Sequence, residues 1–163
     1  MTSDAAMGLS AQETEDLLAV LDDEYRAHAT YSQILEDFGE VGPFINIREA
    51  EGRHIDALLG LLGYFEIPVP SNDWPGRVSR YSSVQEACAA GVNAEIENAA
   101  LYDLVLTHTS RSELITVYEN LQRASRENHL PAFQRCAGIR GTPPEAAGPR
   151  GRGRRLRARR GRR

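Results

Sequence analysis

Three glutamates and two histidines have the types and spacing of metal ligands. Glu51 and His54 form a Glu-x-x-His step, which places a carboxylate and an imidazole on the same face of a helix. Glu24 lies in the segment before this step, and Glu95 and His129 occupy matching places in the second half of the chain. A buried carboxylate is costly unless it is paired or binds a metal. The pattern therefore predicts a metal site, and its ligand types suit iron or manganese.

Four helices are needed to position these side chains. Apolar residues recur at helical spacing in four segments, and the five candidate ligands fall on the same inward stripes. The segments run from about Ser10 to Phe38, from about Pro43 to Leu62, from Ser83 to about His108, and from Ser110 to just before Gly138. The pattern predicts an all-α protein built around a single helical bundle.

Local signals mark the ends of these helices. A serine followed three residues later by glutamate predicts a capping box. The sequence has three such pairs at predicted starts, namely Ser10 with Glu13, Ser83 with Glu86, and Ser110 with Glu113. Gly39 and Gly63 follow the first two helices, where glycine often ends a helix.

The connections predict how the helices are arranged. Short links between the first two helices and between the last two predict two antiparallel hairpins. The middle link, from Tyr64 to Tyr81, contains Pro68, Pro70 and Pro75 and cannot be the interior of a helix. Its residues can extend over roughly 60 Å, whereas a helix of about 25 residues is roughly 37 Å long. The link can therefore return along the whole bundle as a crossover.

The two halves also show an internal repeat. Tyr31 follows Glu24 by seven residues, and Tyr102 follows Glu95 by seven. Two hairpins related by a pseudo-twofold axis would bring all the candidate ligands to the middle of the bundle. We interpret both tyrosines as core residues with hydrogen-bonded hydroxyls, with a role in carrying an electron or radical as the alternative.

The chain resembles the ferritin-like dimetal carboxylate superfamily. The resemblance covers about Leu17 to Cys136 and rests on residues 22–25, 51–54, 94–102 and 128–133. It is nearest to an uncharacterised ferritin-like family, related to rubrerythrins, that is known only as a domain of unknown function. It implies a ferritin-like four-helix bundle over residues 10–138 with a long crossover after the second helix. It also implies two iron ions (or manganese) bound by Glu24, Glu51, His54, Glu95 and His129.

One position departs from the superfamily pattern. Where a glutamate is expected three residues before His129, this chain has Arg126. Glu127 precedes the histidine by two residues, so on a regular helix it would point about 200° away. Pro131 lacks an N–H and favours a kink or a π-bulge nearby, which would swing Glu127 inward. Without such a bulge the site lacks one carboxylate, or Arg126 partly neutralises it.

His28 has two interpretations. It lies one turn after Glu24 on the same stripe. It is either a further metal ligand or partner of a carboxylate, or a hydrogen-bonded histidine of the core.

The two cysteines are expected to lie close together. Cys88 precedes Glu95 by seven residues and Cys136 follows His129 by seven. Because the last two helices are antiparallel, both cysteines fall in one layer at one end of the bundle. They can form a disulfide or a redox pair beside the metals. The alternative is two small buried apolar residues in a reducing cytoplasm.

Charge is strongly segregated along the chain. Nine of its 19 arginines lie in residues 150–163, which contain no acid, so the other 149 residues carry ten basic and 23 acidic side chains, a net charge of −13. We expect residues 139–163 to be a disordered tail that either binds nucleic acid or another polyanion, packs against an acidic body, or has no selected role. Residues 1–9 are expected to be a flexible N-terminus.

The sequence indicates no route to a membrane. No apolar run approaches the roughly 18 residues of a membrane span, and the first residues lack the pattern of a secretory signal. We therefore expect a cytoplasmic protein that does not contact membranes.

Three functions are compatible with these features. The first is a redox protein that oxidises ferrous iron or reduces peroxide, acting with an external electron donor or the cysteine pair. The second is a metal-binding or storage protein without turnover. The third is a structural bundle whose Arg-rich tail binds polyanions. A homodimer is the expected assembly.

Overall fold

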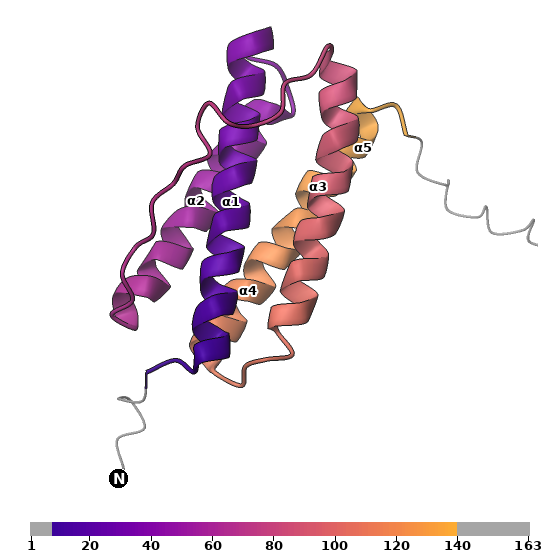
Figure 1. Ribbon diagram of the computed structural model, residues 1–163. Coiled ribbons are helices and arrows are strands. Elements are labelled where there is room, and N and C mark those ends of the chain that lie inside the picture. The colour runs from indigo at the N-terminus through magenta and orange to yellow at the C-terminus, as the bar shows by residue number, and fades with distance from the viewer. Residues whose placement is uncertain (1–7, 140–163) are drawn as a thin grey trace, which may run out of the picture.

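The computed structural model describes residues 8–139 as a bundle of long helices (Figure 1). The elements are α1 (Ala11–Phe38), α2 (Phe44–Tyr64), α3 (Val84–Val105), α4 (Ser112–Ala124), the π-helix η1 (Ser125–His129) and α5 (Leu130–Cys136). The described residues contain no strand, so the all-helical architecture is confirmed. Residues 1–7 and 140–163 lie outside the described part, and with them most of the predicted N-terminus and Arg-rich tail.

The directions of the helices follow from the lengths of the links. Short connections reverse the chain between α1 and α2 and between α3 and α4 (Figure 1). Residues 65–83 instead run back along the outside of the bundle, so that α2 and α3 point the same way (Figure 1). The predicted crossover is therefore present. It places α1 between α2 and α3, while the last helix packs against α3 and α2.

The start of α1 forms as predicted. Ser10 Oγ accepts a hydrogen bond from the backbone N–H of Glu13, whose side chain accepts one from the backbone N–H of Ser10. At the other end Gly39 has a positive φ of 82°, a conformation that glycine adopts without steric cost. At α3, Ser83 caps the Glu86 N–H, but the Glu86 carboxylate turns to Ser82.

The predicted start of the last helix was wrong. The Ser110–Glu113 capping box does not form, and α4 begins at Ser112 after Arg111. The Thr109 hydroxyl donates to Glu13 and accepts from the Arg111 N–H, and Arg111 itself contacts Glu13. These contacts tie the link to the start of α1 and keep the chain extended two residues longer.

The last helix is continuous but changes its winding in the middle. Five residues, Ser125–His129, form a π-helix between α4 and α5. Pro131, the second residue of α5, has no N–H to donate to the preceding turn. The π-helix absorbs one extra residue per turn. It thereby sets which side chains before His129 face the interior.

Two apolar clusters fill the interior of the bundle. One surrounds Leu21, Leu58 and Tyr118, and the other surrounds Ile34, Phe44 and Phe133. The candidate ligands belong to neither cluster and form a buried polar layer in α1, α2, α3 and η1.

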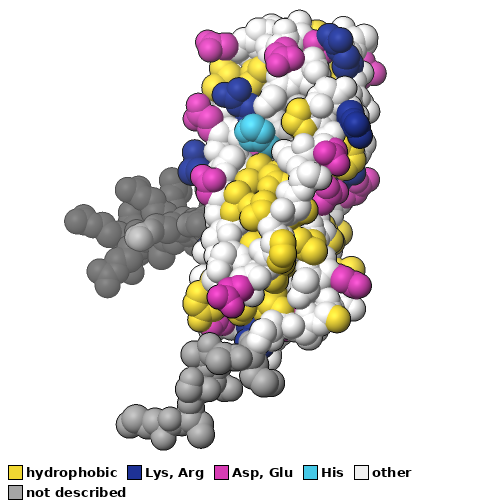
Figure 2. All heavy atoms as spheres, turned by 60° about the vertical axis from the view of Figure 1, so that its left-hand side comes forward, with side chains coloured by type: hydrophobic (Ala, Val, Ile, Leu, Met, Phe, Trp, Pro, Cys, Tyr) yellow, Lys and Arg dark blue, Asp and Glu magenta, His cyan; other side chains and the backbone are white. Residues whose placement is uncertain are grey.

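The surface is mostly polar with local apolar areas. Figure 2 shows the molecule turned so that the left side of Figure 1 comes forward. On this face apolar side chains gather along the middle, and charged side chains lie mostly toward the edges. Tyr64 and Val69, at the end of α2 and in the crossover, are the most exposed large apolar residues described. Among the described residues, no helix combines the length and hydropathy that spanning a membrane requires.

Candidate metal centre

Five ionisable side chains from four elements converge inside the bundle. Each exposes less than a tenth of its surface: Glu24 1%, Glu51 2%, His54 8%, Glu95 3% and His129 4%. Glu24 comes from α1, Glu51 and His54 from α2, Glu95 from α3 and His129 from η1. Five ionisable groups in a buried layer need strong compensation.

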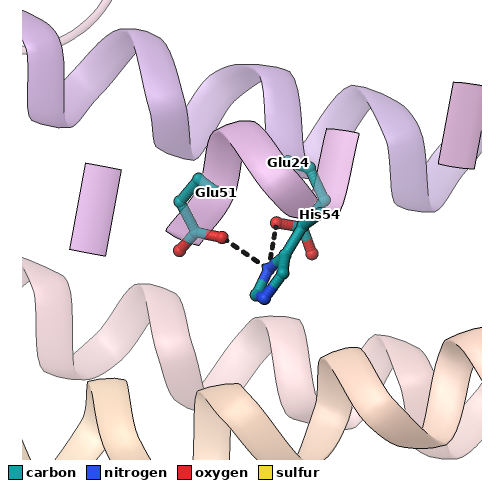
Figure 3. A group of neighbouring side chains, drawn as sticks. All are labelled: Glu24, Glu51 and His54. Atoms are coloured by element: carbon teal, nitrogen blue, oxygen red, sulfur yellow. Dashed lines mark hydrogen bonds and ion pairs between the residues drawn. The ribbon is translucent and has the colours of Figure 1, made fainter. Parts of the chain in front are cut away.

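The first group joins α1 and α2. His54 Nδ1 lies 2.8 Å from Glu51 Oε2 and 3.3 Å from Glu24 Oε2. Figure 3 shows both carboxylates directed at the same edge of the imidazole ring. Because Glu51 and His54 are one turn apart on α2, the local helix geometry alone makes them neighbours.

The second group joins α2, α3 and η1. His129 Nδ1 lies 3.2 Å from Glu51 Oε1 and 3.5 Å from Glu95 Oε2. Glu51 therefore belongs to both groups, with one oxygen facing each histidine. The rings of His54 and His129 are stacked, with centroids 5.5 Å apart.

Hydrogen bonds do not fully account for this arrangement. Each Nδ1 atom lies near oxygens of two carboxylates, whereas an imidazole nitrogen donates at most one hydrogen. Glu51 Oε2 and His129 Nδ1 are buried without a hydrogen bond of acceptable geometry. In each group one ligand atom per residue lies within 4.8 Å of the others. Oxygen and nitrogen atoms that converge in this way fit a metal ion, so both groups can hold one.

Protons balance the carboxylates when no metal is bound. Burial lowers the pKa of His54, but the neighbouring carboxylates of Glu24 and Glu51 outweigh it and raise the pKa to about 10. For His129, burial is likewise outweighed by Glu51 and Glu95, and its pKa rises to about 9. Burial, together with the charge of Glu51, raises the pKa of Glu24 to about 7. Burial also acts to raise the pKa of Glu51, but the two histidines hold it below its ordinary value. A divalent cation would replace these protons.

Two tyrosines hold the Glu24 and Glu95 carboxylates in place, each from the other half of the chain. The Tyr102 hydroxyl, on α3, donates to Glu24 Oε1 at 2.7 Å, and the Tyr31 hydroxyl, on α1, donates to Glu95 Oε1 at 2.9 Å. Each tyrosine thus orients the ligand of the opposite half. Both are buried core residues with hydrogen-bonded hydroxyls, as the sequence indicated.

Sequence reasoning missed Asn98. This residue is buried one turn after Glu95, and its amide donates to Glu24 Oε1 at 3.2 Å and to Asp23 at 2.9 Å. Its carbonyl accepts from the Ser125 hydroxyl at 2.6 Å. The available signal was a polar residue on the same helix face as Glu95.

Two predicted site residues lie outside the groups. The π-helix forms where the sequence suggested, but Glu127 is exposed, because the wide turn directs Ser125 and His129 inward instead. His28 is half-buried and faces Gly52 on α2 rather than the carboxylates. Burial and the nearby charge of Arg48 lower its pKa.

Arg126 does not neutralise the site. It is exposed and pairs with Asp103 on the surface of α3. The last helix thus contributes a histidine and no carboxylate to the two groups.

The cysteines lie in one layer at the end of the bundle. Cys88 and Cys136 form a disulfide with Cα atoms 5.8 Å apart, which joins the start of α3 to the end of α5. Cys88 is fully buried in the cluster around Phe133.

Comparison with known proteins places the chain in a family. Residues 13–147 match the domain family described as "Uncharacterized protein domain (DUF2202)". The chain belongs to this family. A relative, the uncharacterized protein MJ0754 of Methanocaldococcus jannaschii, is 32% identical over 78% of this chain and 76% of its own length.

A solved structure has the same fold as this chain. The crystal structure of hypothetical protein MJ0754 from Methanococcus jannaschii superposes with a TM-score of 0.73 at 27% identity. The match covers 84% of this chain and 86% of that one. These similarities identify the family and the fold of the chain.

Proposed function

We propose that the protein is a ferritin-like metalloprotein that binds two redox-active ions, iron or manganese, with Glu51 as the carboxylate they share. The observation that carries this proposal is the placement of Glu51, whose Oε2 faces His54 and whose Oε1 faces His129. Glu24 with His54 would hold one ion, and Glu95 with His129 the other. The order of the helices, with a long crossover between α2 and α3, supports the ferritin-like type.

The residues around the site prepare it for chemistry with dioxygen or peroxide. When bound, iron or manganese supplies the one-electron steps that ferrous oxidation or peroxide reduction requires. Tyr31 and Tyr102 hold the outer oxygens of Glu95 and Glu24, so the carboxylates keep their orientation. Each group offers three side chains, fewer than an octahedral ion takes. Coordination positions on each ion would therefore remain for a substrate. An external donor would supply electrons.

Metal content tests this proposal. Protein purified without chelators and loaded anaerobically with Fe(II) or Mn(II) should contain two ions per chain, one for each group. Glu51→Ala should lose both ions, and His54→Ala should lose the ion of the first group. Glu49→Ala, an exposed glutamate on α2, and His28→Ala should retain the full content.

The outcomes separate the alternatives. Two ions together with ferrous oxidation or peroxide reduction, both absent in Glu51→Ala, would support a redox enzyme. Bound metal without turnover would indicate a metal-binding protein, and no uptake of either ion would refute the proposal.

A further inference from the structure

A cavity leads from the surface to one side of the metal centre. It has a volume of about 420 Å³, lies between α1, α3 and the crossover, and reaches Glu51 and Glu95. Glu24 and His54 are not part of its wall. Glu51 belongs to both groups, and among the residues that belong to one group only, Glu95 alone lines the cavity. A molecule entering from this direction therefore approaches the group that contains Glu95.

Small side chains create this space. Ala27 on α1 and Ala90 and Ala94 on α3 are among the residues that line it. Larger residues at these positions would let the two helices fill the gap by packing. The outer wall is the crossover, whose Trp74 donates from Nε1 to Asp22 Oδ1 at 2.9 Å. The crossover is thus anchored to α1 at the mouth of the cavity.

Charge is balanced around the mouth. Arg26 pairs with Asp23, and its guanidinium lies 5.8 Å from the centroid of the Trp74 ring. Arg77 and Glu97, both exposed, add one charge of each sign. The side chains of Asp23, Arg26, Arg77 and Glu97 carry no net charge together, so the mouth does not select an ionic ligand. The remaining two carboxylates of the wall, Glu51 and Glu95, would face the bound ion, and the alanines, Tyr31 and Ile34 offer apolar surface.

The cavity is much larger than an oxidant needs. A water molecule occupies about 30 Å³ of liquid, so dioxygen or peroxide would fill a small part of it. Pockets for small organic ligands begin at about 300 Å³. We propose that this cavity binds a small uncharged organic substrate with an apolar body, next to the ion held by Glu51, Glu95 and His129. This inference rests on the proposed metal centre.

Trp74 provides the measurement, because it is the only tryptophan of the chain and lies in the wall. Metal-loaded protein is titrated with 1-hexanol and, in parallel, with 1,2,6-hexanetriol, which has the same carbon chain and two more hydroxyls. Hexanol should change the tryptophan fluorescence to saturation, and the triol should bind at least tenfold more weakly. Equal effects of the two, or no saturable effect of hexanol, would overturn the proposal.

Variants locate the binding. Ala90→Phe fills the cavity from α3 and should weaken hexanol binding at least tenfold with unchanged metal content. Ala27→Leu fills it from α1 and serves the same purpose if the first variant fails to fold. Ala89→Phe is the matched control, because Ala89 is exposed on the same helix and does not line the cavity. Unchanged binding in both filled variants would overturn the proposal.

The two proposals fail in different ways. Two bound ions with no saturable hexanol binding would refute the substrate cavity alone. Hexanol binding to protein that takes up no metal would refute the metal centre, and the substrate role of the cavity with it.

Discussion

Tyr31 and Tyr102 determine how firmly the outer carboxylates are held. Their hydroxyls donate to Glu95 and Glu24, each across the interface between the two halves. A carboxylate that loses such a donor has a less fixed orientation and binds a metal less tightly. The two tyrosines would therefore act on different ions.

Replacing these hydroxyls tests that division. Tyr102→Phe should weaken the ion bound by Glu24 and His54 about tenfold, and Tyr31→Phe the ion bound by Glu95 and His129 by a similar factor. Metal titration followed by spectroscopy measures both affinities. Tyr118→Phe is the control, because the Tyr118 hydroxyl is buried without a hydrogen-bond partner. Equal losses in all three variants would contradict the assignment.

Glu13 makes stability depend on pH. Burial tends to raise its pKa, but hydrogen bonds from Thr109 and Ser10 and the charge of Arg111 hold the pKa below its ordinary value. A lowered pKa means that the ionised form stabilises the fold. This contribution is complete above the unfolded value of about 4.3 and is lost as the pH falls through the folded value.

Glu13→Gln should reveal this contribution. At pH 7 the free energy of unfolding of the variant should be about 1 kcal/mol lower than that of the wild type, because charge-assisted hydrogen bonds are lost. At pH 3, below the unfolded value, the difference should be smaller, because protonation of the wild-type carboxyl removes part of the contribution. Urea unfolding at both pH values measures it. A difference that grows in acid would contradict the sign.

At the scale of elements, Gly91 sets the distance between α3 and α5. A Cβ at this position would lie 2.9 Å from the Phe133 ring, which is fully buried and closed in by Tyr31 and Phe44. Alanine normally stabilises a helix relative to glycine by up to about 1 kcal/mol. Here the overlap with a ring that has no room to move reverses the sign.

Gly91→Ala should therefore destabilise the protein by about 1 to 3 kcal/mol. Gly60→Ala is the matched control on α2, where a Cβ meets nothing within 4 Å. That variant should be stabilised by about 0.5 to 1 kcal/mol. Thermal unfolding of the two variants checks both signs, and stabilisation of Gly91→Ala would contradict the close packing.

The sequence indicated where the π-helix forms but not which side chains it directs inward. Pro131 indicated an irregular turn before it, and the irregular turn is present. Its consequence was the opposite of the one expected for Glu127, which stays exposed while Ser125 is buried. The rotation of a wide turn depends on what packs against it, here the Asn98 carbonyl bound to the Ser125 hydroxyl.

At the scale of the molecule, the candidate metal centre joins all the long helices. Its ligands come from α1, α2, α3 and η1, in a layer that neither apolar cluster includes. Ions that bind this layer bind only the folded chain, so they shift the unfolding equilibrium.

Metal should accordingly stabilise the whole bundle. At a free metal concentration a hundred times the dissociation constant, each ion should add about 2.7 kcal/mol to the free energy of unfolding. Thermal unfolding with Fe(II) or Mn(II), and again after chelation, measures the gain. Glu51→Ala should show no gain, and an equal gain in that variant would mean that the ions bind elsewhere.

The sequence by itself determined the helices and the faces on which the candidate ligands lie. Both follow from relations within one or two turns, such as the step from Glu51 to His54 and the capping of Glu13 by Ser10. The crossover after α2 could likewise be predicted from the length of the link alone. These features need no knowledge of what packs against the helices.

Only the tertiary structure decided which atoms meet. Glu51 contacts both histidines, each tyrosine binds the carboxylate of the other half, and Asn98 binds Glu24 from α3. These contacts depend on the rotation and spacing of the packed helices. The cavity has the same origin, since small residues on α1 and α3 leave space only once the two helices face each other. Contacts between residues far apart in the chain are fixed by packing, and no local pattern encodes them.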